Sequence, residues 1–547
     1  MTAFVLATLL AAGSMGAIDF PVSGGDRCQR GFTEGMLALH SFMYDRAHAV
    51  FQATAKDAPA CAMARWGEAM AYSHPIWGEE NVPAARAALQ AVTGEEKLTP
   101  RERAFLGAAR ALWGEGEPLA RGRAWLKAAE RMHRDFPADD EVSLEYALAL
   151  IANSDRLSNT RRLMEAAALA QDVLQRRPNH PGAAHYLIHA CDSPDHAVLA
   201  LPAARRYAQI APAASHALHM PAHIFLQLGM YPEVASSNEA SWAASRLEAS
   251  RETQGPDGRD WHSYSWLVDA YLNLGKLQKA EALLRSLRDM LVKDDGAQTR
   301  FGYVTSLSSY LQVTGRWSQL AELAGPLGKR LPLEKGEPEG SLGCATHAPG
   351  GAASRPPFGL LAEILFAELR AQAAMMAGDE AGVASALEPV PALQAATAPW
   401  GTKGLYKSMQ DRWEQLPAAL KASARARKAS TPAAHKEAVA AFEKLAASPD
   451  LFVNGPAFYA PAAQLLGDEL LAAGQPKEAL AAYERVLLAH PLLPRALLGA
   501  ARAAKAAGDL DTARERYAAL SRQWEHADAG QPALEETRGA LKLTAGR

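Results

Sequence analysis

The chain has 547 residues, of which 49% are hydrophobic and 21% are charged, and its formal net charge is −3. A near-neutral charge without a Lys/Arg cluster argues against nucleic acid or an anionic membrane surface as a partner. Alanine is abundant, and short Gly/Pro/Asp turns separate long stretches of good helix formers, so we expect an all-α protein. No internal apolar run approaches the length of a membrane span, so we expect no integral membrane segment after signal removal.

The N-terminal segment MTAFVLATLLAAGSMGA is uncharged and mostly apolar, and it ends in small residues. This pattern predicts a signal peptide over residues 1–17 and a periplasmic or secreted protein. The usual basic residue before the apolar stretch is missing, so a buried structural helix in a cytoplasmic protein stays open as an alternative. If the chain is exported, Cys28 and Cys61 are the preferred disulfide pair.

Residues 18–330 contain pairs of helical segments with a shared pattern. YDRAHAVFQATAKDAP places Ala47 four residues before Phe51, and LGMYPEVASS and LNLGKLQKAEALL place Gly229 and Gly275 at turns. Small and aromatic residues at fixed positions in paired helices are typical of a helical repeat. We therefore expect an N-terminal solenoid over this range.

Residues 331–358 interrupt the helical pattern. This segment holds five Pro and five Gly in 28 positions, a composition that no helix tolerates. We expect a Pro/Gly-rich linker or loop here, followed by C-terminal helical repeats over residues 359–547.

The clearest repeats lie near the C-terminus. Gly474 and Gly508 are 508 − 474 = 34 residues apart, and each precedes an Ala and a Tyr at the same spacing, as in Ala479 and Tyr483. A period of 34 residues with these small and aromatic positions is typical of tetratricopeptide repeats (TPR). The sequence therefore predicts a tetratricopeptide-like α-solenoid, in which stacked helical hairpins form a right-handed superhelix.

Histidines recur at this same period. His185 and His189 are four residues apart, so on a helix they share one face and can chelate one metal ion. His219 and His223 follow at the repeat distance (219 − 185 = 34), and His216 shares their face. We expect these five imidazoles to point into one stretch of the concave groove, with His185, His189, His219 and His223 as the core ligands.

Further polar residues are expected to flank this groove. His262 and Asp269 occupy corresponding positions in the next repeat, and either His216 or His262 is expected to complete the ligand set. His40 and His74 are also 34 residues apart, near the ends of two first helices. The other candidates, as ligands, hydrogen-bond acceptors or groove residues, are Glu68, Asp192 and Tyr186.

Pro221 lies within the second histidine segment and leaves two interpretations open. It either kinks one helix, because proline cannot donate an intrahelical hydrogen bond, or it belongs to a helix that begins at Met220. In the second case His216 and His219 belong to the preceding turn.

Imidazole ligands suit Zn, Cu, Fe and Ni, and several histidines with a carboxylate can form a mono- or dinuclear site. The first hypothesis is therefore a transition metal ion (Cu, Fe or Zn) whose open coordination position supports Lewis-acid or redox catalysis, as in a hydrolase or an oxidoreductase. Two alternatives stay open: a non-enzymatic scaffold that binds a peptide or protein in its groove, and a metal storage or delivery protein. No phosphate-binding glycine loop, G-x-S-x-G elbow or H-E-x-x-H motif suggests another chemistry.

Four segments together resemble a family of bacterial, often exported tetratricopeptide-repeat proteins. They are LALHSFMYDRAHAVF, DAPACAMARWGEAMAYSHPIW, HPGAAHYLIHACDSPDHA and YAQIAPAASHALHMPAHIFLQLGM. The resemblance spans about residues 28–275, and the motifs HPGAAHY-x-IHA and HMPxHIF are its most specific part. It implies the repeat fold and a special groove, and it implies no particular reaction.

Overall fold

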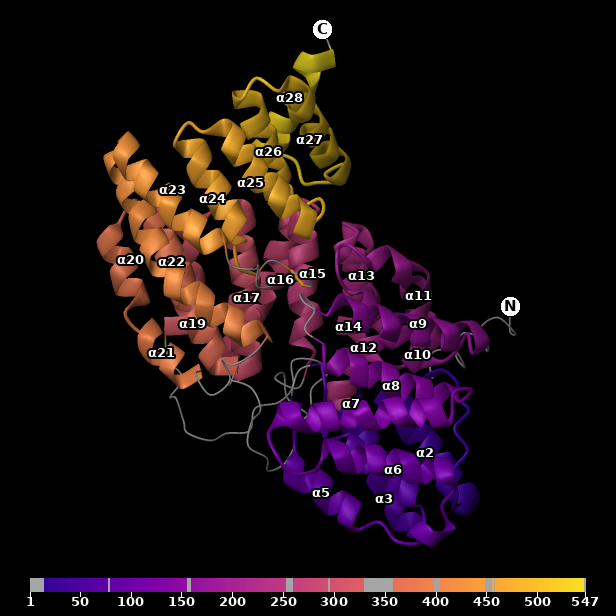
Figure 1. Cartoon of the computed structure of the whole chain (residues 1–547). Helices are drawn as coiled ribbons and strands as arrows, with labels where there is room; N and C mark the ends of the chain where they lie inside the picture. The colour runs from indigo at the N-terminus through magenta and orange to yellow at the C-terminus, as the bar shows by residue number, and fades with distance from the viewer. Residues whose placement is uncertain are drawn as a thin grey trace. The chain divides into compact units, whose positions relative to one another are not determined.

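The computed structural model describes residues 14–76, 79–154, 159–251, 259–293, 296–328, 358–397, 404–447, 455–456 and 458–545. Figure 1 labels the helices of the chain. The chain divides into two compact units. Unit 1 comprises the described residues up to Phe225 and those from Ser237 to Asp260. Unit 2 comprises Leu226–Ser236 and the described residues from Trp261 onward.

Unit 1 is built from short and medium helices with one two-residue antiparallel ladder, and the boundary between the units passes through its last two helices. In chain order its elements are α2 (Gly25–His40), α3 (Tyr44–Asp57), α4 (Ala62–Met70), β1 (Ser73–His74), β2 (Glu79–Glu80), α5 (Val82–Gln90), η1 (Glu95–Lys97), α6 (Pro100–Leu112), α7 (Pro118–Asp135), α8 (Asp140–Ala152), α9 (Thr160–Arg176), α10 (Pro181–Cys191), α11 (Ala197–Ile210), α12 (Ser215–His219), α13 (Pro221–Gln227) and α14 (Tyr231–Arg251).

Unit 2 is helical in all its described elements. These are α15 (Trp261–Asn273), α16 (Leu277–Lys293), α17 (Ala297–Thr314), η3 (Trp317–Gln319), α18 (Leu320–Leu323), η4 (Gly325–Gly328), α19 (Phe358–Met376), α20 (Glu380–Leu387), α21 (Val390–Thr397), α22 (Gly404–Ala429), α23 (Pro432–Ala446), α24 (Ala462–Ala472), α25 (Pro476–Ala489), α26 (Pro494–Ala506), α27 (Leu510–Gln523) and α28 (Pro532–Ala545).

Successive helices form hairpins that stack on their neighbours in the chain. In unit 1, α9 packs against α8 and α10, and in unit 2, α25 packs against α24 and α26. Each hairpin leaves an apolar face that the next hairpin covers, which is how a solenoid builds its core. The prediction of an all-α, tetratricopeptide-like solenoid is confirmed.

The aromatic residue of the repeat pattern packs between two glycines. Tyr483 of α25 is 1% exposed, and it packs where α24 and α26 carry Gly467 and Gly499. A Cβ atom at Gly499 would lie 2.5 Å from Cε1 of that ring, so only glycine allows this approach. The aromatic position of the repeat therefore depends on two glycines in neighbouring helices.

The same arrangement occurs in unit 1, where the sequence pattern is weaker. Phe51 of α3 is fully buried between Gly35 of α2 and Gly67 of α4. Both glycines are 16 residues from Phe51 (51 − 35 and 67 − 51), as Gly467 and Gly499 are from Tyr483. The identical spacing shows that the first hairpins of unit 1 follow the same packing rule.

The turns between paired helices use glycine for a backbone reason. Gly474 follows α24 with φ 73°, a left-handed conformation that residues with a side chain rarely adopt. The next residue, Gln475, donates its N–H to the carbonyl of Leu470, which satisfies a carbonyl at the helix end. The expected interhelical turn at this position is confirmed.

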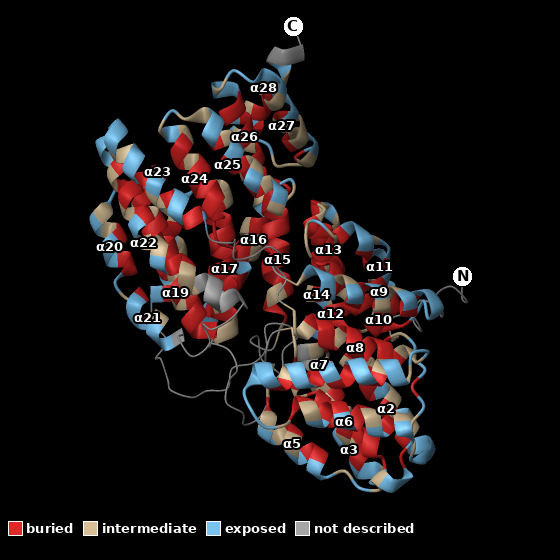
Figure 2. Ribbon diagram, viewed as in Figure 1, coloured by how far each residue is buried: buried red, intermediate tan, exposed pale blue. Residues whose placement is uncertain are grey.

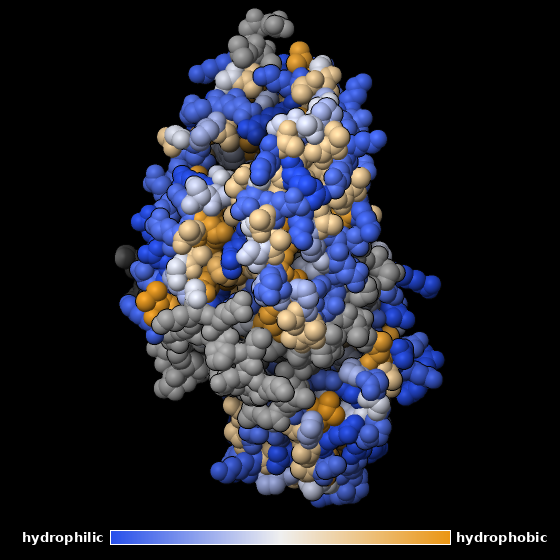
Figure 3. Space-filling view, turned by 90° about the vertical axis from the view of Figure 1, so that its left-hand side faces the viewer, coloured by the Kyte–Doolittle hydropathy of each residue, from blue (hydrophilic) through white to orange (hydrophobic). Residues whose placement is uncertain are grey.

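Buried side chains concentrate where hairpins face one another, and exposed ones lie on the outer helical faces (Figure 2). One face of the molecule is mostly hydrophilic with small scattered apolar patches (Figure 3). Within the part of the chain that the structure describes, no helix is both long and apolar enough to cross a bilayer.

The N-terminal prediction is only partly covered by the described residues. Residues 1–13 of the predicted signal peptide lie outside them, as do residues 331–357 of the predicted linker. Ser14 accepts a hydrogen bond from the N–H of Ala213 at 3.1 Å, and the N–H of Ala17 donates to Asn179 at 3.0 Å. The described part of this segment therefore packs against unit 1.

The preferred disulfide is present in unit 1. It joins Cys28 of α2 to Cys61, directly before α4, and both residues are buried. A cross-link between two segments of one hairpin layer restricts the unfolded chain and so stabilises the fold.

We predict that Gly67→Ala lowers the free energy of unfolding by about 1–3 kcal/mol, because the new methyl group overpacks the Phe51 ring. Its matched control is Gly107→Ala, in an exposed position of α6 where a Cβ meets no atom within 4 Å. The control should raise stability by about 0.5–1 kcal/mol, since alanine is the better helix former. Urea denaturation measures both, and equal effects of the two substitutions would contradict the proposed packing.

Candidate metal centre

His185 and His189 lie on α10, a helix with a side-chain cap at its N-terminus. His180 precedes α10, and its side chain accepts a hydrogen bond from the N–H of Ala183, while Pro181 occupies the first turn. Proline is favoured there because its missing N–H would have no partner within the helix. All residues of α10 are buried, so His185 and His189 lie inside unit 1.

The second histidine group lies on two short helices in place of one. α12 ends at His219, Met220 forms a turn, and α13 begins at Pro221. The structure thus combines the two interpretations. The helix is interrupted before Pro221, yet His216 and His219 remain helical. The break follows from proline, which cannot donate to the carbonyl one turn earlier.

Five of the predicted histidines come together in unit 1. Their exposed fractions range from 0% for His185 to 9% for His223. Ring centroids are 4.7 Å apart for His185 and His189, and 6.1 Å apart for His189 and His223. The other two members of the set are His216 and His219, and their ring centroids are 6.2 Å apart. These imidazoles were expected on an open groove wall, and the structure instead buries them.

Three of the five form a compact group of possible ligands. His185, His189 and His216 each offer a nitrogen, and these nitrogens lie within 4.8 Å of one another. The Nε2 atoms of His185 and His216 are 3.1 Å apart. Nδ1 of His185 lies 2.7 Å from the backbone carbonyl oxygen of His40, so Nδ1 carries the proton and donates it. In the neutral ring, Nε2 then has a free lone pair directed at His216.

The other two histidines face each other in the same way. Nδ1 of His219 donates to Oδ1 of Asn238 at 2.7 Å, and Nδ1 of His223 donates to Oδ2 of Asp192 at 2.9 Å. Their Nε2 atoms are 3.1 Å apart. Because each Nδ1 carries a proton, two neutral rings would direct two Nε2 lone pairs at each other. A cation between them, either a proton or a metal ion, removes this repulsion.

Burial argues against a positively charged ring in the first group. Desolvation lowers the pKa of His185 to about 3, an effect that nearby histidines strengthen and that the hydrogen bond to the His40 carbonyl only partly opposes. The ring is therefore neutral at physiological pH, which is the form that binds metal ions.

The spacing of the nitrogens fits a metal ion. Two imidazole nitrogens that share a tetrahedral zinc ion at ~2.05 Å lie roughly 3.3 Å apart. The two Nε2 pairs, each separated by 3.1 Å, are close to this value. Metal-bound histidines also usually donate their other N–H to a carbonyl or a carboxylate, as three of these five do.

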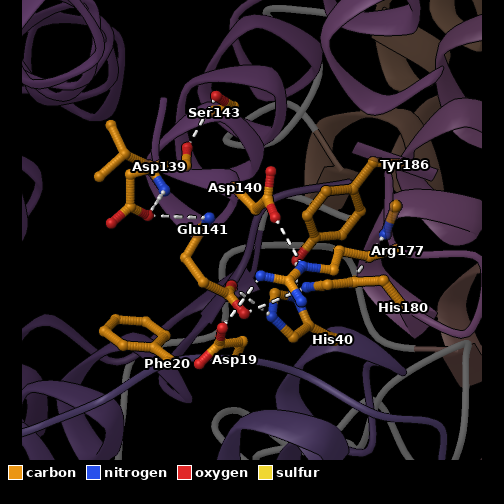
Figure 4. Close-up of polar contacts among 12 residues, drawn as sticks. Asp19, Phe20, His40, Asp139, Asp140, Glu141, Ser143, Arg177, His180 and Tyr186 are labelled. Atoms are coloured by element: carbon orange, nitrogen blue, oxygen red, sulfur yellow. Dashed lines mark hydrogen bonds and ion pairs between the residues drawn. The ribbon is translucent and has the colours of Figure 1, made fainter. Parts of the chain in front are cut away.

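A second polar group surrounds Glu141 and includes His40, His180 and Tyr186 (Figure 4). Glu141 of α8 accepts hydrogen bonds from Nε2 of His40 at 2.9 Å and from Nε2 of His180 at 3.1 Å. Burial opposes the ionisation of Glu141, but its interactions with the two imidazoles outweigh this effect and hold the pKa of Glu141 well below the usual range. Tyr186 completes this network through a 3.0 Å hydrogen bond between its hydroxyl and Nδ1 of His40.

The atoms of His40, Glu141 and His180 are close enough to hold a metal ion, but their hydrogen bonds favour another role. Nδ1 of His180 accepts from the N–H of Ala183, so in the neutral ring the proton is on Nε2. That Nε2–H donates to Glu141 and has no lone pair for a metal. We therefore treat this group as a hydrogen-bond network that holds His40, whose carbonyl orients His185.

The remaining predicted site residues lie in different surroundings. His74 stacks on Tyr44 with ring centroids 3.8 Å apart. Glu68 accepts hydrogen bonds from Arg65 at 2.7 Å and Gln52 at 3.1 Å. Asp192 is the carboxylate that the structure places on a histidine of the group, as the acceptor of His223.

His262 and Asp269 belong to α15 in unit 2. The His262 ring lies 5.3 Å from that of Trp266. Asp269 is buried and accepts a hydrogen bond from Asn273 at 2.7 Å. Burial raises the pKa of Asp269 to about 7, against the effect of hydrogen bonds from Ser309 and Asn273.

Sequence reasoning missed Glu141, His180 and Asn238. A weak signal existed for His180, because a polar residue directly before a proline that opens a helix often caps that helix. Glu141 and Asn238 follow no repeat spacing relative to the histidines. Glu141 joins His40 and His180, which are 101 and 39 residues away in the chain, whereas Asn238 is 19 residues from His219.

Comparisons with known proteins bear on the fold. Residues 470–525 match the Tetratricopeptide repeat family. The helical hairpins of this segment are similar to tetratricopeptide repeats. This match agrees with the 34-residue period and the glycine turns of the same segment. No curated protein matches the chain in sequence.

Several solved structures are similar to this TPR-type chain at low identity. A structure of Naa15/Naa10 bound to HypK-THB has 15% identity and a TM-score of 0.27, and the match covers 82% of this chain and 66% of that one. The human IFIT1 dimer with PPP-AAAA has 12% identity and a TM-score of 0.36, with 85% and 89% covered. The P58(IPK) TPR domain has 15% identity and a TM-score of 0.20, with 75% and 100% covered. These values are too low to carry an argument about function.

The buried neutral His185 predicts a pH dependence of stability. The unfolded ring takes up a proton below pH ~6.5 whereas the native ring stays neutral down to about pH 3, so the free energy of unfolding falls as pH drops between these values. We expect wild type in chelator to lose about 2 kcal/mol more than His185→Gln between pH 7 and pH 4.5. Denaturant unfolding at both pH values measures this, with exposed His526→Gln as the control that should follow wild type. Equal losses in all three proteins would show that His185 is not a buried neutral base.

Proposed function

We propose that this protein is a TPR-type solenoid whose first unit holds a transition metal centre made of histidines. His185, His189 and His216 bind one ion, and His219 and His223 bind a second ion together with water, substrate or other donors. Imidazole ligands suit Zn, Cu or Fe, and a coordination position taken by water or substrate supports Lewis-acid or redox chemistry.

The observation that carries the proposal is the facing pair of Nε2 atoms in His219 and His223, 3.1 Å apart, with both Nδ1 atoms donating to oxygen. This arrangement leaves the two atoms that face each other as acceptors. A metal ion between the two atoms would use both lone pairs at once. The anchored rings also need no rearrangement on binding, which favours a resident centre over a labile delivery site.

A second candidate function comes from the C-terminal repeats. TPR folds commonly bind protein partners, and residues 470–525 match that family. The non-enzymatic scaffold therefore remains the competing account of the chain. It predicts no bound metal and full partner binding in variants that lack the histidines.

The first test is the metal content of untagged protein, measured by elemental analysis. We expect about two equivalents of a transition metal in wild type and about one in either His185→Ala/His216→Ala or His219→Ala/His223→Ala. Removing two ligands from one ion leaves too few donors to hold it, while the other group is unchanged. Exposed His526→Ala is the matched control and should keep the wild-type content.

Asp192→Ala removes a carboxylate that orients a ring without removing a ligand, and it should weaken metal affinity ~10–100-fold. Asp195→Ala, an exposed position in the same turn, should leave affinity unchanged. Circular dichroism shows whether each variant keeps its helical content. Wild-type protein that contains no metal and takes up no added Zn, Cu or Fe would refute the proposal and favour the scaffold.

A further inference from the structure

A non-helical segment of unit 2 lies buried against helices that are distant from it in the chain. It directly precedes α24, and its described residues, Gly455, Pro456 and Phe458–Pro461, are all buried. Proline at positions 456 and 461 disfavours a helix between them. Connecting segments usually lie on the surface, so a buried one with two adjacent aromatic residues requires an explanation.

Two side chains of α17 hold the backbone of this segment. The carbonyl oxygen of Phe458 accepts hydrogen bonds from the hydroxyl group of Ser308 and from Nε2 of Gln312, the latter at 3.0 Å. Ser308 and Gln312 are four residues apart, so they lie on one face of the helix, and Gln312 also donates to Ser308 at 3.1 Å. Every peptide offers such a carbonyl, so these contacts recognise an extended main chain and no particular side chain.

The two aromatic side chains make the specific contacts. Phe458 and Tyr459 are each 6% exposed. The guanidinium carbon of Arg412 in α22 lies 5.5 Å from the centre of the Tyr459 ring, within range of a cation–π interaction. Burial raises the pKa of Tyr459, and Glu368 of α19 raises it further while Arg412 opposes this, so the hydroxyl group stays protonated. An extended peptide with two adjacent aromatic residues is therefore the ligand that these helices fit.

The segment leaves two polar atoms of this surface unsatisfied. Arg412 donates from Nη2 to Oε1 of Glu368 at 2.6 Å, and both residues are at least 95% buried. Nε of Arg412 and Oε2 of Glu368 have no hydrogen-bond partner among the described residues. Buried polar atoms without partners are unfavourable, and a peptide group can supply both an N–H for the carboxylate and a carbonyl for the guanidinium. A second peptide can thus satisfy this surface more completely than the chain's own segment does.

The connection to α24 explains how the segment stays in place despite this mismatch. The carbonyl of Pro461 accepts a hydrogen bond from the N–H of Gln464 at 2.9 Å, in the first turn of that helix. A segment tethered so closely competes for its site at a roughly millimolar effective concentration. A free peptide must exceed this competition before it binds.

We propose that α17, α19 and α22 form a binding site for an extended peptide of a partner protein that carries two adjacent aromatic residues, and that Phe458–Pro461 occupies this site as an intramolecular competitor. The partner peptide and the segment exclude each other, so binding is coupled to release of the segment. The proposal concerns unit 2 alone and does not rest on the metal centre of unit 1.

The test is fluorescence anisotropy with a fluorescein-labelled peptide that has the sequence of residues 453–463, titrated with the full-length protein. Phe458→Ser/Tyr459→Ser removes the aromatic anchors of the competitor without changing a helix of the site. We expect this variant to bind the peptide at least tenfold more tightly than wild type does, since the tethered competitor is lost. A peptide with both aromatic residues replaced by alanine should bind at least tenfold more weakly to the same variant.

A second release variant guards against misfolding of the first. Ala460→Glu places a carboxylate at a position that is 1% exposed in the docked segment, so it should release the segment and also tighten peptide binding. Circular dichroism shows whether each variant keeps its helical content. Folded release variants that bind the peptide no more tightly than wild type, or equal binding of the two peptides, would overturn the proposal.

A matched pair of serine substitutions tests the location of the site. In the Phe458→Ser/Tyr459→Ser background, Ser308→Ala removes a donor to the peptide backbone and should weaken peptide binding about three- to tenfold. Ser306→Ala is the control, because this serine is equally buried in α17 and its hydroxyl group contacts no polar atom of the described chain. Equal effects of the two substitutions would place the peptide elsewhere and contradict the assignment.

Discussion

The account depends on pairs of imidazole nitrogens that the fold holds face to face away from water. His219 and His223 direct Nε2 atoms at each other at 3.1 Å, and His185 and His216 do the same. Oxygen acceptors on Nδ1 fix the tautomers of three of these rings. A metal ion between two such atoms would use both lone pairs, and the oxygen acceptors on Nδ1 hold the rings in the orientation that this requires.

The solenoid explains how the rings reach these positions. Stacked hairpins bring equivalent positions of successive repeats together, so residues 34 apart in the chain become neighbours. Proline at 221 then divides the second histidine segment into α12 and α13, and His216 and His219 end on a different short helix from His223. His40 in turn donates a hydrogen bond to Glu141, and the backbone carbonyl of His40 accepts a hydrogen bond from His185.

The repeat fold and the grouping of the histidines could be predicted from the sequence. The hydrogen-bond partners of the histidines could not, for a physical reason. Ala479 and Tyr483 predicted the repeat because local spacing sets which side chains a hairpin buries. The period of the histidines likewise indicated that His185 and His219 belong to neighbouring repeats. Their proton acceptors could not be foreseen, since Asn238 and the His40 carbonyl depend on tertiary packing.

The most direct measurement is an anomalous difference map from crystals of the purified protein, collected at the absorption edge of the metal that elemental analysis identifies. The account predicts peaks about 2.0–2.1 Å from Nε2 of His185 and His216, and from Nε2 of His219 and His223. Peaks only at surface residues, or clear density for these five rings with no anomalous peak among them, would contradict it.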